Sequence, residues 1–237
     1  MTAHDWSIFW DRYPRRVGSG NLLGQVGKTI NGVPITEEQL RLLVESVCSS
    51  LQLSRDDHLL DLCCGNGLLT RLLAEHCCSA TGIDFSEPLI DAAREQSAAS
   101  NVKYFRMDVR KLEQLAVLDE QRYTKVLCYE ALAFLDISEF DDLLKQLSRL
   151  TNDAPIILFG SILDQERIWN FFNTVRRKWF YLFHIKFRRK EVGLGRWWRR
   201  QEVMQIANAH GFHCDLLDQP PQLHTAHYRF DALLSKQ

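Results

Sequence analysis

The sequence predicts an α/β fold built around a parallel sheet, and three observations support this. Between Ser54 and Ser161, short apolar runs alternate with segments of helical periodicity, which is the pattern of repeated strand–helix–strand units. A turn containing Gly65-Asn66-Gly67 joins the first apolar run to the helix that follows it. The 237 residues are 46% hydrophobic and 25% charged, a composition that suits a globular chain and excludes a disordered or fibrous one.

The expected strands are short apolar runs bounded by turn residues. They cover His58–Leu62, Ala80–Asp84, Val102–Arg106, Lys125–Tyr129 and Pro155–Gly160, with two more at Phe212–Leu217 and Tyr228–Leu234.

Cap residues mark the expected helices between and around these strands. Thr36 and Gln39 predict a capping box that opens a helix ending near Ser50. Ser86 is expected to cap the helix after the second strand, and Ser138 the helix after the fourth. A last helix is expected over Gln201–His210, where Gly211 would end it.

Several kinds of protein are disfavoured by composition. The seven cysteines include no Cys-x-x-Cys pair, so neither a disulfide framework nor a structural metal site is expected. No apolar run is long enough for a membrane-spanning helix, and the first residues lack the apolar core of a secretion signal. These features predict a soluble cytoplasmic protein.

The formal net charge of −1 conceals a strongly basic segment. Residues 176–200 contain ten lysines and arginines against the single acid Glu191, so they carry +9 and the remainder carries about −10. This surplus indicates that the segment meets something anionic.

Three carboxylates lie where a nucleoside would bind an α/β sheet. Asp61 lies in the first strand, Asp84 ends the second strand 23 residues later, and Asp108 follows the third. The carboxyl edge of such a sheet is where ligands bind, and an acid about 20 residues beyond a glycine turn is placed to bind ribose hydroxyls.

These motifs resemble the first three motifs of the class I S-adenosylmethionine-dependent methyltransferases. The matching stretches are residues 59–67, 82–86 and 105–109, and Cys63 stands where the family usually has its first glycine. The resemblance implies that Asp61 and the loop hold the methionine part of the cofactor, that Asp84 binds both ribose hydroxyls, that Phe85 flanks the adenine and that Asp108 accepts its amino group. The cofactor-binding residues implied are Asp61, Cys63, Gly65, Asn66, Gly67, Asp84, Phe85, Met107, Asp108 and Tyr129.

Other nucleotide sites fit less well. NAD is a poor second choice, because Leu69 and Thr70 follow Gly67 and the full Gly-x-Gly-x-x-Gly is absent. Gly24–Thr29 ends like a phosphate-binding loop but is two residues too short, and no strand precedes it. Residues 18–29 are left open between a flexible loop and a lid over the cofactor, in which Lys28 could pair a carboxylate.

Candidates for chemistry lie at the tip of the fourth strand and in the C-terminal half. Glu130 is the first candidate for a general base or a ligand of the acceptor hydroxyl, and His184 is the second. His224 and His227 are weaker candidates, and Trp10 and Tyr13 resemble the N-terminal aromatics that cover the cofactor in small-molecule methyltransferases. The tip reads Cys-Tyr-Glu-Ala and lacks the Asn/Asp-Pro-Pro-aromatic tetrad of nucleobase methyltransferases, which disfavours that activity.

A helix over Ile168–Phe187 is predicted to be amphipathic. Ile168, Phe171, Phe172, Val175, Trp179, Leu182 and Phe183 share one face of the helical wheel. Three interpretations stay open: a helix packed on the sheet, a lid that closes on an acceptor while arginines hold its phosphate or carboxylate, and an interfacial helix on anionic lipid. Single-stranded nucleic acid would suit the same composition.

We therefore expect a Rossmann-like fold with a seven-strand mixed sheet, helices on both faces, an N-terminal helical lid and a basic aromatic cap inserted after strand five. The expected units are a lid and helix (1–53), an S-adenosylmethionine-binding core (54–161), the cap (162–200) and a last helix with two strands (201–237). The expected function is methyl transfer to a small-molecule acceptor that is anionic, glycosylated or lipid-linked. A catalytically silent S-adenosylmethionine-binding module and an RNA methyltransferase are the alternatives, and peripheral membrane contact through residues 168–200 is an option.

Overall fold

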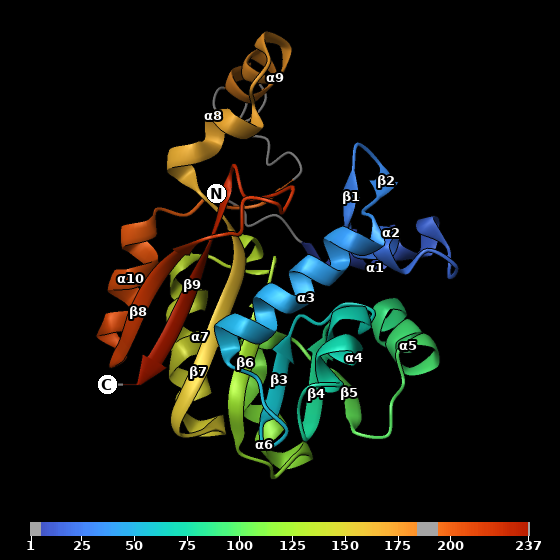
Figure 1. Cartoon of the computed structure of the whole chain (residues 1–237), viewed down its shortest axis with the longest axis vertical. Coiled ribbons are helices and arrows are strands. Elements are labelled where there is room, and N and C mark those ends of the chain that lie inside the picture. Colours follow the sequence, from blue (N-terminus) through green and yellow to red (C-terminus); the bar gives the residue numbers. More distant parts are fainter. Residues whose placement is uncertain (1–5, 184–193, 237) are drawn as a thin grey trace.

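A twisted seven-stranded sheet forms the centre of the computed structural model, which describes residues 6–183 and 194–236 (Figure 1). The strand order is β5-β4-β3-β6-β7-β9-β8. All strands run in one direction except β9, which lies antiparallel between β7 and β8. The strands are β3 (His58–Leu62), β4 (Ser79–Asp84), β5 (Val102–Arg106), β6 (Tyr123–Tyr129), β7 (Thr151–Leu163), β8 (Phe212–Asp218) and β9 (Arg229–Lys236). The predicted seven-strand mixed sheet is confirmed.

Helices cover both faces of the sheet (Figure 1). On one face α3 (Glu37–Leu51) and α4 (Leu68–Ala74) pack over β3, and α5 (Glu87–Gln96) packs beside β5. On the other face lie α7 (Ile137–Leu150) and α10 (Arg200–Ala209). Short helical turns, η1 (Val109–Gln114) and α6 (Leu115–Leu118), follow β5.

The two apolar layers follow from the two-residue period of the strands, whose successive side chains point to opposite faces. In β3, Leu59 belongs to the cluster under α3 and α4, and Leu60 to the cluster under α7 and α10. In β6, Leu127 belongs to the cluster under α3 and α4, and Val126 to the cluster under α7 and α10. Because both faces are buried, these strands read as continuous apolar runs.

Two expected helix starts differ in detail from the structure, although Thr36 is the N-cap of α3 as expected and α7 begins at Ile137, one residue before Ser138. Thr36 accepts the N–H of Gln39 at 3.3 Å, but the Gln39 side chain turns away to the carbonyl of Gln222 at 2.8 Å, so the capping box is only half formed. The helix expected to begin at Ser138 is capped by Asp136 in a complete capping box. The Asp136 carboxylate accepts the N–H of Glu139, and the Glu139 carboxylate accepts the N–H of Asp136.

The N-terminal segment is folded against the core. It contains α1 (Trp6–Val17), α2 (Leu22–Gln25) and a small hairpin of β1 (Thr29–Ile30) and β2 (Val33–Pro34). The Ser86 hydroxyl donates to the carbonyl of Trp10 at 2.8 Å, and the Asn66 amide donates to the carbonyl of Leu22 at 2.8 Å. Residues 18–29 thus form a helical turn and the start of a hairpin, fixed to the carboxyl edge of the sheet.

The continuous helix expected over Ile168–Phe187 is broken. It divides into α8 (Ile168–Phe171) and α9 (Val175–Phe180), preceded by the turn η3 (Gln165–Arg167), and its last residues lie outside the described part of the chain. Thr174 caps α9 by accepting the N–H of Arg177 at 3.2 Å. Ile168 and Phe172 are buried, but Val175 and Trp179, which the wheel placed on the same face, are 74% and 68% exposed.

Trp198 anchors the chain where it returns from this insertion. Its side chain is fully buried against Phe140, with ring centroids 5.5 Å apart, and its indole N–H donates to the carbonyl of Leu132 at 3.0 Å. Its backbone N–H donates to the carbonyl of Leu163 at 2.8 Å. Trp198 therefore fixes the insertion to the end of β7 through its backbone and to the turn after β6 through its side chain.

Replacing Trp198 tests this anchor. We expect Trp198→Ala to lower the free energy of unfolding by about 3–5 kcal/mol, since it leaves a large cavity and an unpaired carbonyl. Trp179→Ala is the matched control at an exposed position and should change it by less than about 0.5 kcal/mol. Urea denaturation followed by circular dichroism measures both, and equal effects would contradict the anchoring role.

Candidate functional site

A cavity of about 1010 Å³ opens at the carboxyl ends of β3, β4 and β6. This edge is where α/β sheets bind ligands, because loops leave it in opposite directions on either side of β3. Its walls come from the loop after β3, the tips of β4 and β6, the N-terminal helix α1 and the insertion after β7. Segments far apart in the sequence thus enclose one space.

Most of the predicted site residues line this cavity. The lining includes Asp61, Cys63, Gly65, Asn66, Asp84, Phe85, Asp108, Tyr129 and Glu130. Gly67 and Met107 are outside the lining: Gly67 forms the turn before α4, and Met107 packs in the apolar core. His184 lies outside the described residues.

Asp84 ends β4 with its carboxylate held by backbone donors. Its two oxygens accept the N–H of Gly65 at 3.0 Å and the N–H of Ser86 at 2.9 Å. Burial raises the pKa of Asp84 to about 6, although these two hydrogen bonds act against the rise. A carboxylate has about four acceptor positions, so two stay available to donors in the cavity.

Asp61 is the second buried carboxylate of the cavity. It is 2% exposed and accepts the hydroxyl of Thr70 at 2.5 Å. Burial raises its pKa to about 7, while the Thr70 hydrogen bond and the charge of Lys28 oppose the rise. Two buried acidic groups that are costly to ionise therefore line the cavity, where a hydrogen-bond donor or a cation would be favoured.

Asp108, by contrast, is already paired. The Arg110 guanidinium donates to both of its oxygens, at 2.6 Å for the shortest contact, and Asp108 also caps η1 by accepting the backbone N–H of Arg110 at 3.0 Å. Burial would raise the pKa of Asp108, but Arg110 lowers it overall. Arg110 also lines the cavity. The sequence analysis missed Arg110, although its place two residues after Asp108 was a usable signal.

The loop after β3 depends on left-handed backbone. Cys63, at the position of the family's first glycine, has φ of 56° and Gly65 has φ of 58°. A Cβ on Gly65 would come within 2.7 Å of Val26 in the N-terminal segment, so glycine allows that segment to close over the loop. The Asn66 side chain lines the cavity and also holds α2, because its amide donates to the carbonyl of Leu22 and to the side-chain oxygen of Gln25.

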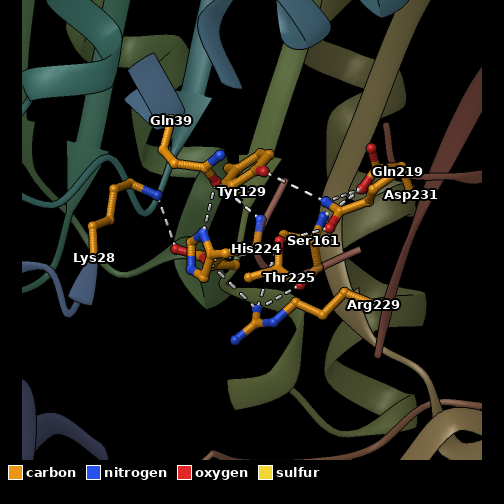
Figure 2. A network of polar contacts seen from close by, with 10 residues as sticks. Lys28, Gln39, Tyr129, Ser161, Gln219, His224, Thr225, Arg229 and Asp231 are labelled. Carbon is orange, nitrogen blue, oxygen red and sulfur yellow. Dashed lines mark hydrogen bonds and ion pairs between the residues drawn. The ribbon is translucent and has the colours of Figure 1, made fainter. Parts of the chain in front are cut away.

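Glu130 lies at the centre of an ionic network at the tip of β6. Lys28 donates to one of its oxygens at 2.9 Å, and Arg229 lies 3.7 Å from the other. Lys28 and Arg229 enter this network from opposite sides (Figure 2). Both cations are nearly buried, with side chains 10% and 11% exposed, while that of Glu130 is 27% exposed.

These ion pairs decide the protonation of Glu130. Burial alone would raise its pKa, but Lys28 and Arg229 outweigh burial and lower the pKa to about 2. Such a carboxylate stays ionised and is a weak base. Of the two roles predicted for Glu130, hydrogen-bond acceptor fits this environment better than general base.

The remaining members of the network, among them Ser161, Arg229 and Asp231, join β7 to β9 (Figure 2). Arg229 donates to the carbonyl of Ser161 at 2.7 Å, and Asp231 accepts the N–H of Ser161 at 2.7 Å. Both Ser161 and Glu130 have left-handed backbone, with φ of 60° and 62°. Strained backbone of this kind, held in place by its surroundings, is concentrated at functional sites.

His224 belongs to the same network but is outside the cavity lining. Its ring nitrogen Nδ1 lies 3.2 Å from the Gln39 amide oxygen, which also accepts the His224 N–H at 2.9 Å. Burial lowers the pKa of His224 despite the opposing charge of Glu130. His224 thus ties the loop before β9 to α3.

Aromatic side chains form part of the cavity wall. Trp6 and Trp10 of α1 face Phe134 of the turn η2 (Leu132–Phe134), with ring centroids 4.8 and 5.7 Å from it. Trp10 lines the cavity as predicted, while Tyr13 stacks on Phe9 outside the lining.

The insertion completes this wall. Phe172, Tyr181, Leu194, Gly195, Arg196 and Trp197 line the cavity. Arg196 is fixed through its N–H, which donates to the carbonyl of Ala133 at 2.7 Å, and its guanidinium lies 4.4 Å above the Trp198 ring. Arg196 and Trp197 belong to the basic aromatic segment of the sequence, for which a lid was one of the open interpretations, but only the fold brings them to the turn after β6.

Within residues 6–183 and 194–236, no cluster of three potential metal ligands is present. In the same part of the chain, none of the helices combines the length and apolarity needed to span a bilayer.

The known proteins to which this chain is similar are methyltransferases. Residues 59–154 match the family model of a methyltransferase domain. A ubiquinone biosynthesis O-methyltransferase of Coxiella burnetii is 32% identical over 107 residues, which span 44% of this chain and 43% of that protein. The chain therefore spans less than half the length of this relative.

Solved structures have the same fold. The magnesium protoporphyrin IX methyltransferase of Synechocystis PCC 6803, with bound S-adenosylhomocysteine, has a TM-score of 0.62 at 16% identity and covers 98% of this chain and 97% of its own. A phosphoethanolamine N-methyltransferase of Haemonchus contortus has a TM-score of 0.70 at 15% identity, covering 100% of this chain and 50% of its own.

The Glu130 ion pairs predict how stability depends on pH. The folded pKa of Glu130 is lowered from 4.5 to about 2, so its stabilisation is complete above pH 4.5 and is lost as the pH falls towards about 2. That shift corresponds to about 3 kcal/mol.

Glu130→Gln removes this contribution and leaves two nearly buried cations unpaired, so the variant should unfold at lower urea concentration at neutral pH. Its difference from the parent should shrink as the pH falls below 4.5. Glu38→Gln, on the exposed first turn of α3, is the control and should follow the parent throughout. A difference between Glu130→Gln and the parent that is the same at every pH would contradict the ion pairing.

Proposed function

Because this chain belongs to the class I S-adenosylmethionine-dependent methyltransferases, we propose that it transfers the methyl group of S-adenosylmethionine to a small-molecule acceptor. One observation carries the proposal: Asp61 and Asp84, buried at the carboxyl edge of the sheet, share a single cavity with the aromatic wall of the insertion. A donor-binding half and an acceptor-binding half thus meet at the tip of β6.

The residues of the sheet edge fit the cofactor. Asp84 keeps two acceptor positions for the ribose hydroxyls after its bonds to Gly65 and Ser86. Asp61 is placed beside the loop, where it would accept hydrogen bonds from the methionine ammonium, and a cation there would favour its ionised form. Phe85 lines the cavity between Asp84 and Leu89 and offers an apolar face to the adenine.

The cavity is large enough for more than the cofactor. Its volume of about 1010 Å³ is at the upper end of the range for small-molecule sites. The second half is apolar and aromatic, with Arg196 as a cation in its wall. This combination favours an acceptor with an apolar body and an anionic group, because an arginine binds carboxylate or phosphate through paired hydrogen bonds.

When bound, the cofactor supplies an electron-poor methyl group on a sulfonium, and the acceptor displaces the sulfur in line. The chain's own contribution is orientation and exclusion of water. Trp10 and Phe134 close one side of the cavity, and the Leu194–Trp197 segment closes another. Glu130, which stays ionised, holds Lys28 across the loop and can accept a hydrogen bond from the acceptor.

The low pKa of Glu130 also favours a second function, a module that binds S-adenosylmethionine without turnover, because that carboxylate is a weak base. Formation of S-adenosylhomocysteine in the presence of a panel of anionic and amphipathic acceptors separates the two. Product that depends on an acceptor supports the enzyme, while tight cofactor binding with no product across the panel supports the silent module.

Asp84→Ala tests the cofactor site. Loss of hydrogen bonds to a charged acceptor should weaken S-adenosylmethionine binding by about 100-fold, since each such bond contributes about 1.5–3 kcal/mol. Isothermal titration calorimetry measures the change, with Asp91→Ala on the exposed surface of α5 as the control. Binding of NAD by the parent at similar affinity, or an unchanged Asp84→Ala, would contradict the assignment.

The raised pKa of Asp84 predicts a pH-dependent affinity. Below about pH 6 the carboxyl is protonated in the free protein, so binding that needs the carboxylate must first release that proton. The association constant for S-adenosylmethionine should therefore fall as the pH drops below about 6, approaching tenfold per pH unit for each such group. Asp84→Asn should bind weakly with a flatter profile, and a parent affinity independent of pH would contradict this role.

A further inference from the structure

The end of the insertion projects from the molecule with apolar side chains exposed. Figure 1 shows α8 and α9 extending beyond the upper end of the sheet. The exposed fractions are 44% for Trp169, 74% for Val175 and 68% for Trp179. Every residue from Asn173 to Phe180 is exposed. These side chains lie on a segment whose other end, at Ile168 and Phe172, is buried in the body of the protein.

The same projection is positively charged. Residues 168–183 contain three cations, Arg176, Arg177 and Lys178, and no acidic residue. None of these three forms an ion pair within the described part of the chain. The arginines nearer the body are used differently, since Arg200 pairs with Asp164 at 2.9 Å and Arg196 with Glu202 at 3.4 Å. Among the described cations of this region, Arg196 and Arg200 are paired internally, whereas Arg176, Arg177 and Lys178 lie at the exposed tip.

We propose that this tip, residues 169–182, docks on an anionic lipid surface. Tryptophan at the level of the headgroups, aliphatic side chains below it and lysine or arginine around them is the composition that binds such interfaces. Val175 and Leu182, exposed at 74% and 40%, favour lipid over single-stranded nucleic acid, because aliphatic side chains offer no face for stacking bases. The Lys178 ammonium lies 6.0 Å from the centre of the Trp169 ring, so charge and apolar surface are adjacent.

Docking at this tip brings the bilayer to the cavity. Phe172, before α9, and Tyr181, after it, both line the cavity and contact each other with ring centroids 4.8 Å apart. The helix that would touch the lipid therefore lies between two residues of the acceptor wall. If the proposed methyl transfer holds, the acceptor that reaches this wall from the docked surface is an amphipathic molecule carried in the bilayer.

Co-sedimentation with vesicles tests the docking. The whole protein is mixed with vesicles of phosphatidylcholine alone and of phosphatidylcholine with phosphatidylglycerol. We expect binding to the anionic vesicles only, weakening as salt is added. Neutralising the tip with Arg176→Gln, Arg177→Gln and Lys178→Gln should reduce the partition coefficient roughly 100-fold at low salt. Trp179→Ser should also reduce it, since the indole supplies the apolar contact.

Matched variants serve as controls. Arg41→Gln and Val117→Ser change an exposed cation and an exposed apolar residue elsewhere and should leave sedimentation unchanged. Calorimetric titration with S-adenosylmethionine checks that the tip variants stay folded and tests the cofactor site separately from lipid binding. Equal sedimentation with neutral and anionic vesicles, none with either, a triple variant that sediments like the parent, or preferential binding of a single-stranded RNA homopolymer would each overturn the proposal.

Discussion

The ion pairs of Glu130 hold together the parts on which the site depends. Its carboxylate joins Lys28, from the N-terminal segment, to Arg229, at the start of β9, across the tip of β6. Two nearly buried cations are tolerable there because a carboxylate lies between them, and removing one partner of such a set leaves an uncompensated charge. The N-terminal segment and the start of β9 are thus coupled through one side chain at the tip of β6.

A second coupling runs through the insertion after β7. Trp198 fixes its return in the core, and Arg196 and Trp197, beside it, become part of the cavity wall. The insertion therefore has a rigid base and an exposed end. In the proposed methyltransferase, the sheet edge would bind the cofactor and the insertion would contact the acceptor, so that the acceptor could differ while the fold stays the same.

The carboxylates of the site divide according to their partners. Asp61 and Asp84 are buried, form no ion pair with another described residue and have raised pKa values, whereas Asp108 and Glu130 are paired with arginine or lysine and have lowered ones. Asp61 and Asp84 are suited to accept hydrogen bonds from a ligand, because such bonds would stabilise the ionised carboxylate that burial disfavours. The second pair is suited to fix the surrounding structure.

Local sequence determined the sheet and the cofactor side of the cavity, because strand periodicity and the turn before α4 are set by neighbouring residues. Asp61, Asp84 and Glu130 line the cavity because each lies at or next to the carboxyl end of a strand, and their roles stay predictions. Tertiary structure alone decided the partners: Lys28 with Glu130, Gln39 with His224, and Arg196 with the turn after β6 join segments far apart in the chain. It also decided the break at Phe172–Thr174, since a helical wheel assumes one straight helix and cannot register that only its first turn meets the core.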